Sequence, residues 1–416
     1  MPEESKSWAD RDAAVVWHGF TRMGSFTDGT PVIVERAEGH ELIDVDGKRY
    51  LDAISSLWVN TLGHRVPELD QALRDQLDRV AHSTLLGHGN RVVVELAEAL
   101  ASVVPVDRPH FLFAGDGASA VEQALKLAVQ FSGRSGFLAF GGAYHGDTVG
   151  TLSLGDDGAF GTEVFARLRF PVLRAPGFDD PLCFETAAGM VRAHASELAA
   201  VVVEPLVQGA AGMRMAPPDG FALLGDACRD AGVLLVFDEV ATGFGRNGTL
   251  FAAEQCGVRP DLLCLGKGIT GGYLAMSATV ASGRVFDSLA GETFFHGHSY
   301  GGNALGAAVA LRHLQLVQET GVLANVVARS AQLRALLAER VAPLDGVGDI
   351  RLCGLMGGVD VAPGWGRAVC AAAIEGGVLL RPLGDVVVLM PPLSITAAEV
   401  ERLVHVLAEA VSHVVG

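Results

Sequence analysis

The chain has 416 residues, of which 50% are hydrophobic and 19% are charged, and its formal net charge is −17. That length and apolar content predict a large buried core, divided into about two or three domains. Because an acidic chain without a basic stripe repels phosphate groups and anionic lipids, the composition argues against binding to nucleic acid or to a membrane surface.

The N-terminus and the cysteine and histidine patterns set further limits. Residues 1–12 are polar and acidic, unlike a signal or transit peptide, and no apolar run is long enough to cross a bilayer. We therefore expect a cytoplasmic protein. The six cysteines form no C-x-x-C pair, which predicts free thiols, and the scattered histidines indicate no metal site.

The first hundred residues predict a small antiparallel unit followed by two helices. Residues 1–30 look irregular. Residues 31–53 alternate between apolar and polar side chains and contain two turn signals with glycine, which predicts an antiparallel hairpin or meander. Helical periodicity follows over residues 68–83 and 91–104.

Strands and helices alternate from residue 110 onward. Short apolar runs predict buried strands at residues 110–113, 136–140, 199–205, 232–238 and 261–266. Helical stretches lie between them, notably at residues 119–131 and 221–232. Alternation of this kind predicts the α/β class, with a mostly parallel sheet covered by helices on both faces.

From about residue 320 the pattern changes to that of a small α+β unit. Helical and strand-like stretches follow one another there, and a long amphipathic helix ends the chain. We expect residues 61–320 to form a large α/β domain and residues 321–416 a small domain, joined through a helix near residues 303–319. The N-terminal segment, residues 1–60, is expected to be part of the small domain.

Two charged residues follow successive apolar runs of this pattern. Asp238 ends the run LLVFD, and Lys267 follows DLLCLG, 29 positions later. A buried carboxylate there can pair with a protonated ring nitrogen, and an amine in an apolar setting has a lowered pKa and becomes a nucleophile. Pyridoxal phosphate chemistry needs that pair. Singly, such an Asp often caps a helix and such a Lys is usually exposed, but together with a Gly-rich loop upstream they favour the catalytic interpretation.

That glycine-rich loop is the first candidate phosphate site. In FAGDGASAVE, Gly115 and Gly117 permit close backbone approach, and the helix that follows offers free N–H groups to a phosphate. The string also matches the dinucleotide fingerprint G-x-G-x-x-A, which would make the chain a nicotinamide-dependent dehydrogenase. This alternative lacks the acid that is expected at the end of the next strand.

Four more residues lie at predicted strand ends or in polar turns. Tyr144 is placed either to stack on a planar ring or to pack within its loop. Glu204 is placed to orient Asp238 or ring substituents, or to cap the next turn. Ser299 is a second candidate phosphate contact. Arg381 is a candidate for bidentate contact with a substrate carboxylate, the alternative being a surface salt bridge.

At these motifs the sequence resembles the class III (ω-amino) aminotransferases of the fold-type I pyridoxal phosphate group. The resemblance extends from about Val16 to the C-terminal helix and is carried by AYHGDTVG, DEVATGFGR, GKGITGGYL and HGHSYGGN. It implies a fold-type I architecture, pyridoxal 5'-phosphate as cofactor, and transamination. The strings VWHGFT, SSLW and VQGAAGM are similar to the subgroup that aminates 8-amino-7-oxononanoate to 7,8-diaminononanoate in biotin biosynthesis.

The resemblance implies roles for the residues that would hold the cofactor. Lys267 resembles the lysine that forms the Schiff base, and Asp238 the partner of the ring nitrogen. Tyr144 resembles the tyrosine that stacks on the ring. Gly117 and Ala118 occupy positions of the phosphate loop.

It also implies roles for residues around the substrate. Trp58 resembles an aromatic residue of the substrate pocket, and Arg381 the arginine that holds the carboxylate of the oxononanoate. Gly297, His298 and Ser299 match a segment that the family contributes from the neighbouring subunit. A homodimer with shared active sites is therefore expected.

Three departures from the family pattern bear on the amino donor and on the phosphate. Phe20 and His298 replace a tyrosine and a proline of the branch that uses S-adenosylmethionine, and they resemble the branch that uses lysine. Asp116 and Ala118 replace small hydroxyl residues in the phosphate loop. Because a carboxylate repels a phosphate, we expect Asp116 to turn outward or to cap the helix, leaving the phosphate to backbone N–H groups and Ser299.

The sequence leaves the amino donor open between S-adenosylmethionine and lysine. The nearest alternative function is that of another class III ω-aminotransferase, acting on a different ketone or aldehyde in secondary metabolism. A pyridoxal phosphate mutase or racemase is a further alternative. A non-catalytic binding protein is disfavoured because it would not need Lys267.

Overall fold

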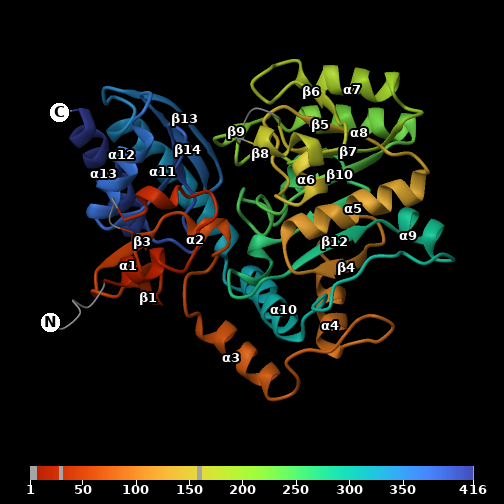
Figure 1. The fold of residues 1–416 in the computed structure, drawn as a ribbon, viewed down its shortest axis with the longest axis horizontal. Coiled ribbons are helices and arrows are strands. Elements are labelled where there is room, and N and C mark those ends of the chain that lie inside the picture. Colours follow the sequence, from red (N-terminus) through yellow and green to blue (C-terminus); the bar gives the residue numbers. More distant parts are fainter. Residues whose placement is uncertain (1–6, 28–30, 157–161, 416) are drawn as a thin grey trace.

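The computed structural model describes residues 7–27, 31–156 and 162–415. Figure 1 shows two bodies of packed helices and strands: the middle of the chain forms one, and the two ends of the chain meet in the other. Within the described ranges, no helix is both long and apolar enough to span a membrane. All six cysteines are free thiols, and five of them are buried.

A seven-stranded sheet forms the centre of the first body, with the strand order β4-β12-β11-β10-β7-β5-β6. Its strands are β4 (His110–Ala114), β5 (Gly136–Phe140), β6 (Leu173–Ala175), β7 (Leu198–Val203), β10 (Leu234–Asp238), β11 (Leu262–Leu265) and β12 (Ser277–Ala281). Only β12 pairs in antiparallel fashion with its neighbours in this sheet. The predicted α/β class and mostly parallel sheet are confirmed.

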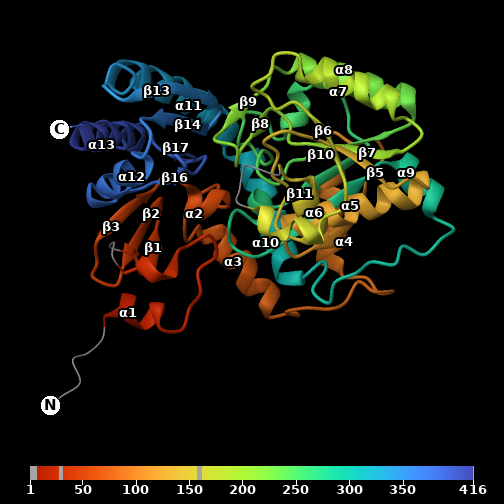
Figure 2. The ribbon, with the colours of Figure 1, turned by 45° about the horizontal axis from the view of Figure 1, so that its top comes forward.

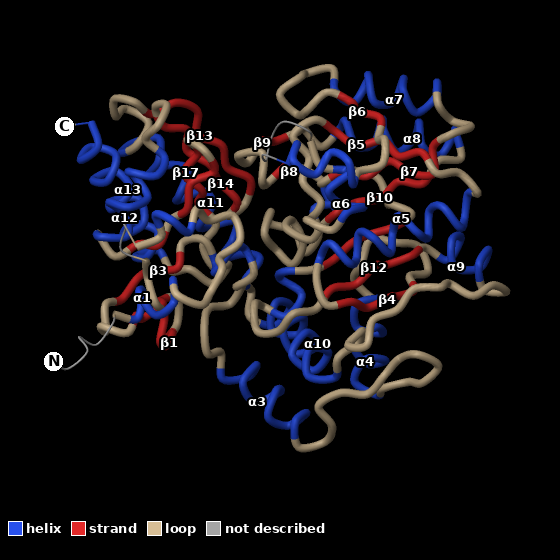
Figure 3. Tube along the Cα trace, in the orientation of Figure 1, coloured by secondary structure: helices blue, strands red, loops and turns tan. Residues whose placement is uncertain are grey.

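Helices cover both faces of this sheet because the side chains of its central strands alternate between two apolar clusters. Val236 packs in one cluster with residues of α5 (Gly117–Ser132), whereas Phe237 packs in the other with residues of α7 (Cys183–Ala193) and α8 (Asp219–Ala231). In the view of Figure 3, β7 and β10 lie between α5 and this helix pair. Burial on both faces explains why the central strands are continuous apolar runs.

The predicted N-terminal meander is confirmed, and it has an additional strand. β1 (Val34–Glu38), β2 (Glu41–Asp44) and β3 (Arg49–Asp52) pair in antiparallel order. β15 (Val378–Leu379) then adds to β3 in parallel. This pairing joins the two ends of the chain, which lie together in Figure 2 as the red and blue segments.

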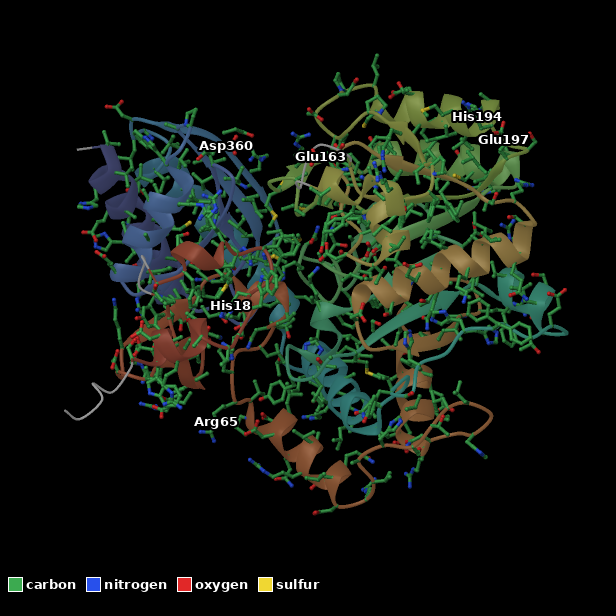
Figure 4. The ribbon with its side chains drawn as sticks, in the orientation of Figure 1. His18, Arg65, Glu163, His194, Glu197 and Asp360 are labelled. Atoms are coloured by element: carbon green, nitrogen blue, oxygen red, sulfur yellow. The ribbon has the colours of Figure 1, made fainter. Side chains whose placement is uncertain are left out.

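A third sheet lies beside this one, with the strand order β13-β14-β17-β16. Its strands are β13 (Val347–Cys353), β14 (Met356–Val361), β16 (Arg381–Leu383) and β17 (Val386–Leu389), and its neighbouring helices are α11 (Val322–Arg340), α12 (Gly366–Glu375) and α13 (Ala397–Val415). In Figure 4, the labelled Asp360 lies on β14, in the body formed by the two ends of the chain. The labelled His194 and Glu197 lie on the far side of the body formed by the middle of the chain. The domain boundaries near residues 60 and 320 stay predictions.

Two helical predictions need correction. Within the segment predicted to be irregular, α1 (Trp8–Ala13) forms because Ser7 and Asp10 make a reciprocal capping box. α3 (Pro67–Leu77) ends well before residue 83. There the side-chain amide of Gln76 donates to the carbonyl oxygen of Val80, so the chain closes a turn instead of continuing the helix.

The other described elements are short connections, apart from two longer helices that pack against each other. The longer helices are α4 (Arg91–Ala101) and α10 (Ala304–Glu319). The short elements are α2 (Ser55–Trp58), α6 (Val149–Leu154), β8 (Val207–Gln208), β9 (Arg214–Met215), α9 (Gly283–Leu289) and the 3-10 helices η1 (Met23–Ser25), η2 (Thr162–Leu168), η3 (Ala252–Gln255) and η4 (Lys267–Thr270).

Candidate active site

A cavity of about 480 Å³ lies where β7, β10 and β11 end at their carboxyl edge. Ligands of open α/β sheets bind at this edge because the loops after parallel strands meet there. Eight of the residues singled out in the sequence line the cavity: Trp58, Asp116, Gly117, Ala118, Tyr144, Glu204, Asp238 and Lys267. The fold therefore brings together residues that are separated by more than 200 positions in the chain.

Asp238 is buried at the end of β10, and its carboxylate has two hydrogen-bond donors. The Nδ1 atom of His145 lies 2.7 Å from Oδ2, and the backbone N–H of Val240 donates to Oδ1 at 3.1 Å. The sequence had offered helix capping as an alternative role, but no helix begins directly after Asp238. Its carboxylate instead faces the cavity.

Sequence reasoning missed His145, which it had grouped with the scattered histidines. The ring is buried, and its Nε2 atom has no hydrogen-bond partner among the described residues. His145 was detectable in principle, because it directly follows Tyr144 in a loop at the same sheet edge as Asp238. Its Nδ1 contact fixes the orientation of the Asp238 carboxylate.

Lys267 is half-buried at the start of η4 and follows β11 and Gly266. Burial lowers the pKa of Lys267, because the charged ammonium loses solvation, while the nearby carboxylates of Asp238 and Glu204 oppose the shift. The lowered pKa agrees with the sequence prediction. The amine Nζ lies 5.3 Å from the centroid of the Trp58 ring, so the indole forms a wall beside it.

Glu204 is buried directly after β7 and caps the turn that follows it. Its two carboxylate oxygens accept hydrogen bonds from the backbone N–H groups of Tyr144, at 3.1 Å, and Gly209, at 3.2 Å. Burial raises the pKa of Glu204 to about 7. Of the roles left open by the sequence, the geometry supports the cap, which ties two loops of the cavity together.

The glycine-rich loop leads into α5, and Asp116 is the N-cap of that helix. Asp116 Oδ1 accepts a hydrogen bond from the backbone N–H of Ser119 at 2.8 Å, which confirms the predicted capping. At Gly117, a Cβ atom would lie only 2.5 Å from Cγ1 of Val240. Glycine is therefore needed where this loop passes over Val240, in the wall of the cavity.

The half-buried Tyr144 also lines the cavity, and its phenol is oriented by a neighbouring carboxylate. The hydroxyl group donates to Asp147 Oδ2 at 2.8 Å. Burial, followed by this hydrogen bond, raises the pKa of Tyr144 above its ordinary value. Asp147 was not singled out in the sequence, although it lies in the same string as Tyr144 and lines the cavity.

Phe20 and Arg381 do not line the cavity. Phe20 is 73% exposed and lies in a surface hollow with Arg22, Phe26 and Arg367. Figure 4 shows His18, two positions earlier in the chain, among the elements of the second body. Arg381 is half-buried on β16, and its side chain makes no hydrogen bond or ion pair with the described residues.

The segment Gly297–Ser299 also lies outside the cavity of its own chain. Gly297 and His298 line a separate hollow with Leu86 and His88. The carbonyl oxygen of Ser299 accepts a hydrogen bond from His82 at 2.6 Å. Within one chain, the predicted second phosphate contact therefore does not reach the glycine-rich loop.

Comparison with known proteins identifies the family. The family model described as Aminotransferase class-III matches residues 24–411 of this chain. The chain belongs to the class-III aminotransferases. A curated relative of this class-III aminotransferase, the adenosylmethionine-8-amino-7-oxononanoate aminotransferase of Nitratidesulfovibrio vulgaris, is 45% identical over 441 aligned residues, which cover 96% of this chain and 80% of that protein.

Solved structures of transaminases share the same fold. The adenosylmethionine-8-amino-7-oxononanoate aminotransferase of Methanocaldococcus jannaschii has a TM-score of 0.93 at 35% identity, and the match covers 97% of this chain and 98% of that one. An amine transaminase from an uncultivated Pseudomonas species, solved in its pyridoxal phosphate-bound form, has a TM-score of 0.90 at 31% identity, with 95% and 98% covered.

Proposed function

We propose that this aminotransferase uses pyridoxal phosphate to transfer an amino group to 8-amino-7-oxononanoate, forming 7,8-diaminononanoate in biotin biosynthesis. The observation that carries the proposal is the presence of a half-buried lysine and a buried carboxylate in one cavity, at the ends of adjacent strands β11 and β10. The name of the relative that is 45% identical supports the choice of acceptor. The amino donor is S-adenosylmethionine or lysine.

The residues of the cavity fit pyridoxal phosphate. The start of α5, at Gly117 and Ala118, lines the cavity, and the N–H groups of a helix N-terminus are suited to a phosphate. Asp238 offers a carboxylate for the ring nitrogen, Tyr144 and Val240 offer surfaces for the ring, and Lys267 offers its amine. When bound, this cofactor supplies an electron sink for the carbon that gains or loses the amino group.

The residues of the cavity move a proton, orient the Asp238 carboxylate and limit the space beside the Lys267 amine. Burial lowers the pKa of Lys267. Its Nζ atom can therefore take up a proton from a substrate carbon and give a proton back later in the reaction. His145 and the Val240 N–H group hold the Asp238 carboxylate in one orientation. Trp58 forms a wall that limits the space beside the amine.

Arg381 is proposed to bind the carboxylate of the acceptor. The half-buried guanidinium makes no hydrogen bond or ion pair with the described part of its own chain. A planar fork without a protein partner is suited to bidentate contact with a carboxylate. The contact would hold one end of the acceptor, leaving the ketone free to lie near Lys267.

We further propose a homodimer in which Gly297, His298 and Ser299 complete the cavity of the partner subunit. The segment lies in a hollow separate from the cavity of its own chain, which supports a contribution to another copy. Mixing inactive Lys267→Ala subunits with inactive Gly297→Trp subunits is expected to restore up to a quarter of the parent activity. No restoration on mixing, despite subunit exchange, would contradict a shared site.

The acceptor and the donor are tested together by product formation. Purified protein is incubated with 8-amino-7-oxononanoate and either S-adenosylmethionine or lysine, and diaminononanoate is measured by mass spectrometry. We expect product with one of these donors. If product forms only from other ketones or aldehydes, the protein is a different ω-aminotransferase. Isomerised substrate without net amino transfer would instead indicate a mutase or racemase.

The lysine assignment is tested by reduction with borohydride. The chain has only four lysines, Lys6, Lys48, Lys126 and Lys267, so a cofactor adduct is easily located by peptide mass spectrometry. We expect the adduct at Lys267 alone. Lys267→Ala is expected to abolish turnover and the adduct, whereas the control Lys48→Ala keeps both. An unlabelled Lys267 in the reduced, active protein would refute the assignment.

A further inference from the structure

The wall beside the Lys267 amine is built on an unusual backbone. Ser55, Ser56, Leu57 and Trp58 all have positive φ angles, of 50°, 49°, 76° and 71°. None of them is glycine, and left-handed backbone brings Cβ too close to the following carbonyl oxygen in L-residues. Such residues normally occur singly, so four in succession require contacts that hold them.

Asp52 provides the contacts that hold this left-handed turn. Its side chain is fully buried, and Oδ1 accepts the backbone N–H of Ser56 at 2.8 Å. Oδ2 accepts the Ser56 hydroxyl at 2.7 Å and lies 2.9 Å from Nε2 of His64. A second anchor is the Ser55 hydroxyl, which donates to the carbonyl oxygen of Met390 at 2.7 Å.

The turn determines where the Trp58 ring lies. The buried indole has the Lys267 amine 5.3 Å from its centroid. It also contacts Gly209, where a Cβ atom would lie 3.1 Å from Cζ3 of the ring. Because a left-handed turn sends side chains away from the backbone in different directions from a right-handed one, relaxation of the turn would move the indole out of this position.

We propose that Asp52 is a positioning residue for the substrate pocket: it holds Ser55–Trp58 left-handed and so fixes the Trp58 indole beside Lys267. The backbone part of the proposal stands on the contacts alone. Its consequence for substrate binding rests on the proposed function, in which Trp58 is a wall of the acceptor site. Asp52 does not line the cavity and has no direct part in the chemistry.

The test combines a loss with a rescue that restores the backbone but not the carboxylate. Asp52→Ala removes the acceptor of the Ser56 N–H group. Leu57→Gly, at a side chain that is 46% exposed, then lets position 57 adopt its φ of 76° without a steric penalty. Hydrogen exchange of residues 53–60 reports the turn, and initial rates give KM for the acceptor and kcat.

We expect Asp52→Ala to speed exchange in residues 53–60 about tenfold or more, because a hydrogen bond to a charged group is lost. KM for the acceptor is expected to rise by about the same factor, with a smaller change in kcat. The double variant is expected to recover at least half of each change on a logarithmic scale. Asp44→Ala is the control, since Asp44 also caps backbone N–H groups but does not line the cavity.

Unchanged exchange in Asp52→Ala, or a double variant no better than the single one, would overturn the proposal. If Asp52→Ala does not fold, the thermal unfolding midpoints of two single variants test the turn instead. The midpoint of Leu57→Gly must then be higher than that of Leu57→Ala, which is the reverse of the order in a right-handed helix. Exchange and midpoints are measured without substrate. If the parent protein transfers no amino group to the oxononanoate, the proposed function fails while these measurements still decide the role of Asp52.

Discussion

The floor and the rim of the cavity differ in how the chain assembles them. Glu204, Asp238 and Lys267 form the floor, at the ends of three parallel strands of one sheet: Asp238 is the last residue of β10, Glu204 directly follows β7, and Lys267 follows β11 and Gly266. By the rim we mean two residues from other segments: Trp58, which comes from a separate N-terminal turn and lines the cavity, and Arg381, which lies on another sheet and outside the cavity. Neighbouring parallel strands bring their ends together automatically, whereas a rim made from remote segments depends on how whole bodies pack.

The two regions also differ in their electrostatics. On the floor, burial raises the pKa of Glu204 to about 7 and lowers that of Lys267, and every carboxylate there has backbone or histidine donors. On the rim, Arg381 has no partner among the described residues. The floor is thus preorganised before any ligand binds, and the rim is left to be completed by substrate or by a second subunit.

The largest expected effect is on the floor. Asp238→Asn is expected to lower kcat about 10²–10³-fold, because an amide cannot stabilise a protonated ring nitrogen. Cofactor content, measured by absorbance, is expected to stay near that of the parent. The control is Asp261→Asn, since this carboxylate accepts the backbone N–H of Leu235 at the other end of the same strands. A near-normal kcat in Asp238→Asn would contradict the pairing.

On the rim, Arg381→Ala is expected to raise KM for the acceptor about 10²-fold, the loss expected for a charged bidentate contact. The change in kcat is expected to be smaller, because the carboxylate lies away from the reacting carbon. Initial rates over a range of acceptor concentrations measure both. Arg36→Ala, an exposed arginine on β1, is the control. An unchanged KM in Arg381→Ala would move acceptor binding to other residues.

A smaller effect on kcat is expected at His145, which contacts Asp238 of the floor. His145→Ala is expected to lower kcat about tenfold, since the Asp238 carboxylate loses one hydrogen bond of a type worth a factor of this size. His145→Gln retains an N–H donor and is expected to recover part of the loss. If Ala and Gln behave alike, the Nδ1 contact has no role in orienting Asp238.

The smallest effect on catalysis is expected at Glu239, the neighbour of Asp238 outside the cavity. Its buried carboxyl accepts the backbone N–H groups of Ala252 and Ala253, and burial raises its pKa from 4.5 to about 7. A carboxyl with a raised folded-state pKa stabilises the fold most below its unfolded pKa, and this stabilisation is lost as pH rises through about 7.

Glu239→Gln removes that pH dependence. The free energy of unfolding of the variant, relative to the parent, is therefore expected to rise by up to about 3 kcal/mol between pH 4.5 and a pH above 7, at about 1.4 kcal/mol per pKa unit. Urea unfolding at several pH values measures it, and kcat is expected to change little. A constant difference across this range would show that Glu239 is ionised in the folded protein.

Most elements of the large sheet were predictable, because burial on both faces makes a strand a continuous apolar run. β5 has the predicted bounds, and β10 and β11 lie within the predicted ranges. The strands β6 and β12 were missed. β6 has only three residues, and β12 reads SATVA, whose small and polar side chains gave no apolar run. Their place in the sheet is visible only from the pairing with their neighbours.

By itself, the sequence determined the family, the parallel sheet and the strand-end positions of Asp238 and Lys267, because apolar period and local turn chemistry act over short stretches of chain. Only the tertiary structure decided that His145 meets Asp238 and that β15 joins the two chain ends. It alone decided that SSLW turns left-handed without a glycine. The first two features depend on contacts between residues far apart in sequence, and the turn depends on the buried hydrogen bonds of Asp52 and Ser55, none of which leaves a local apolar periodicity.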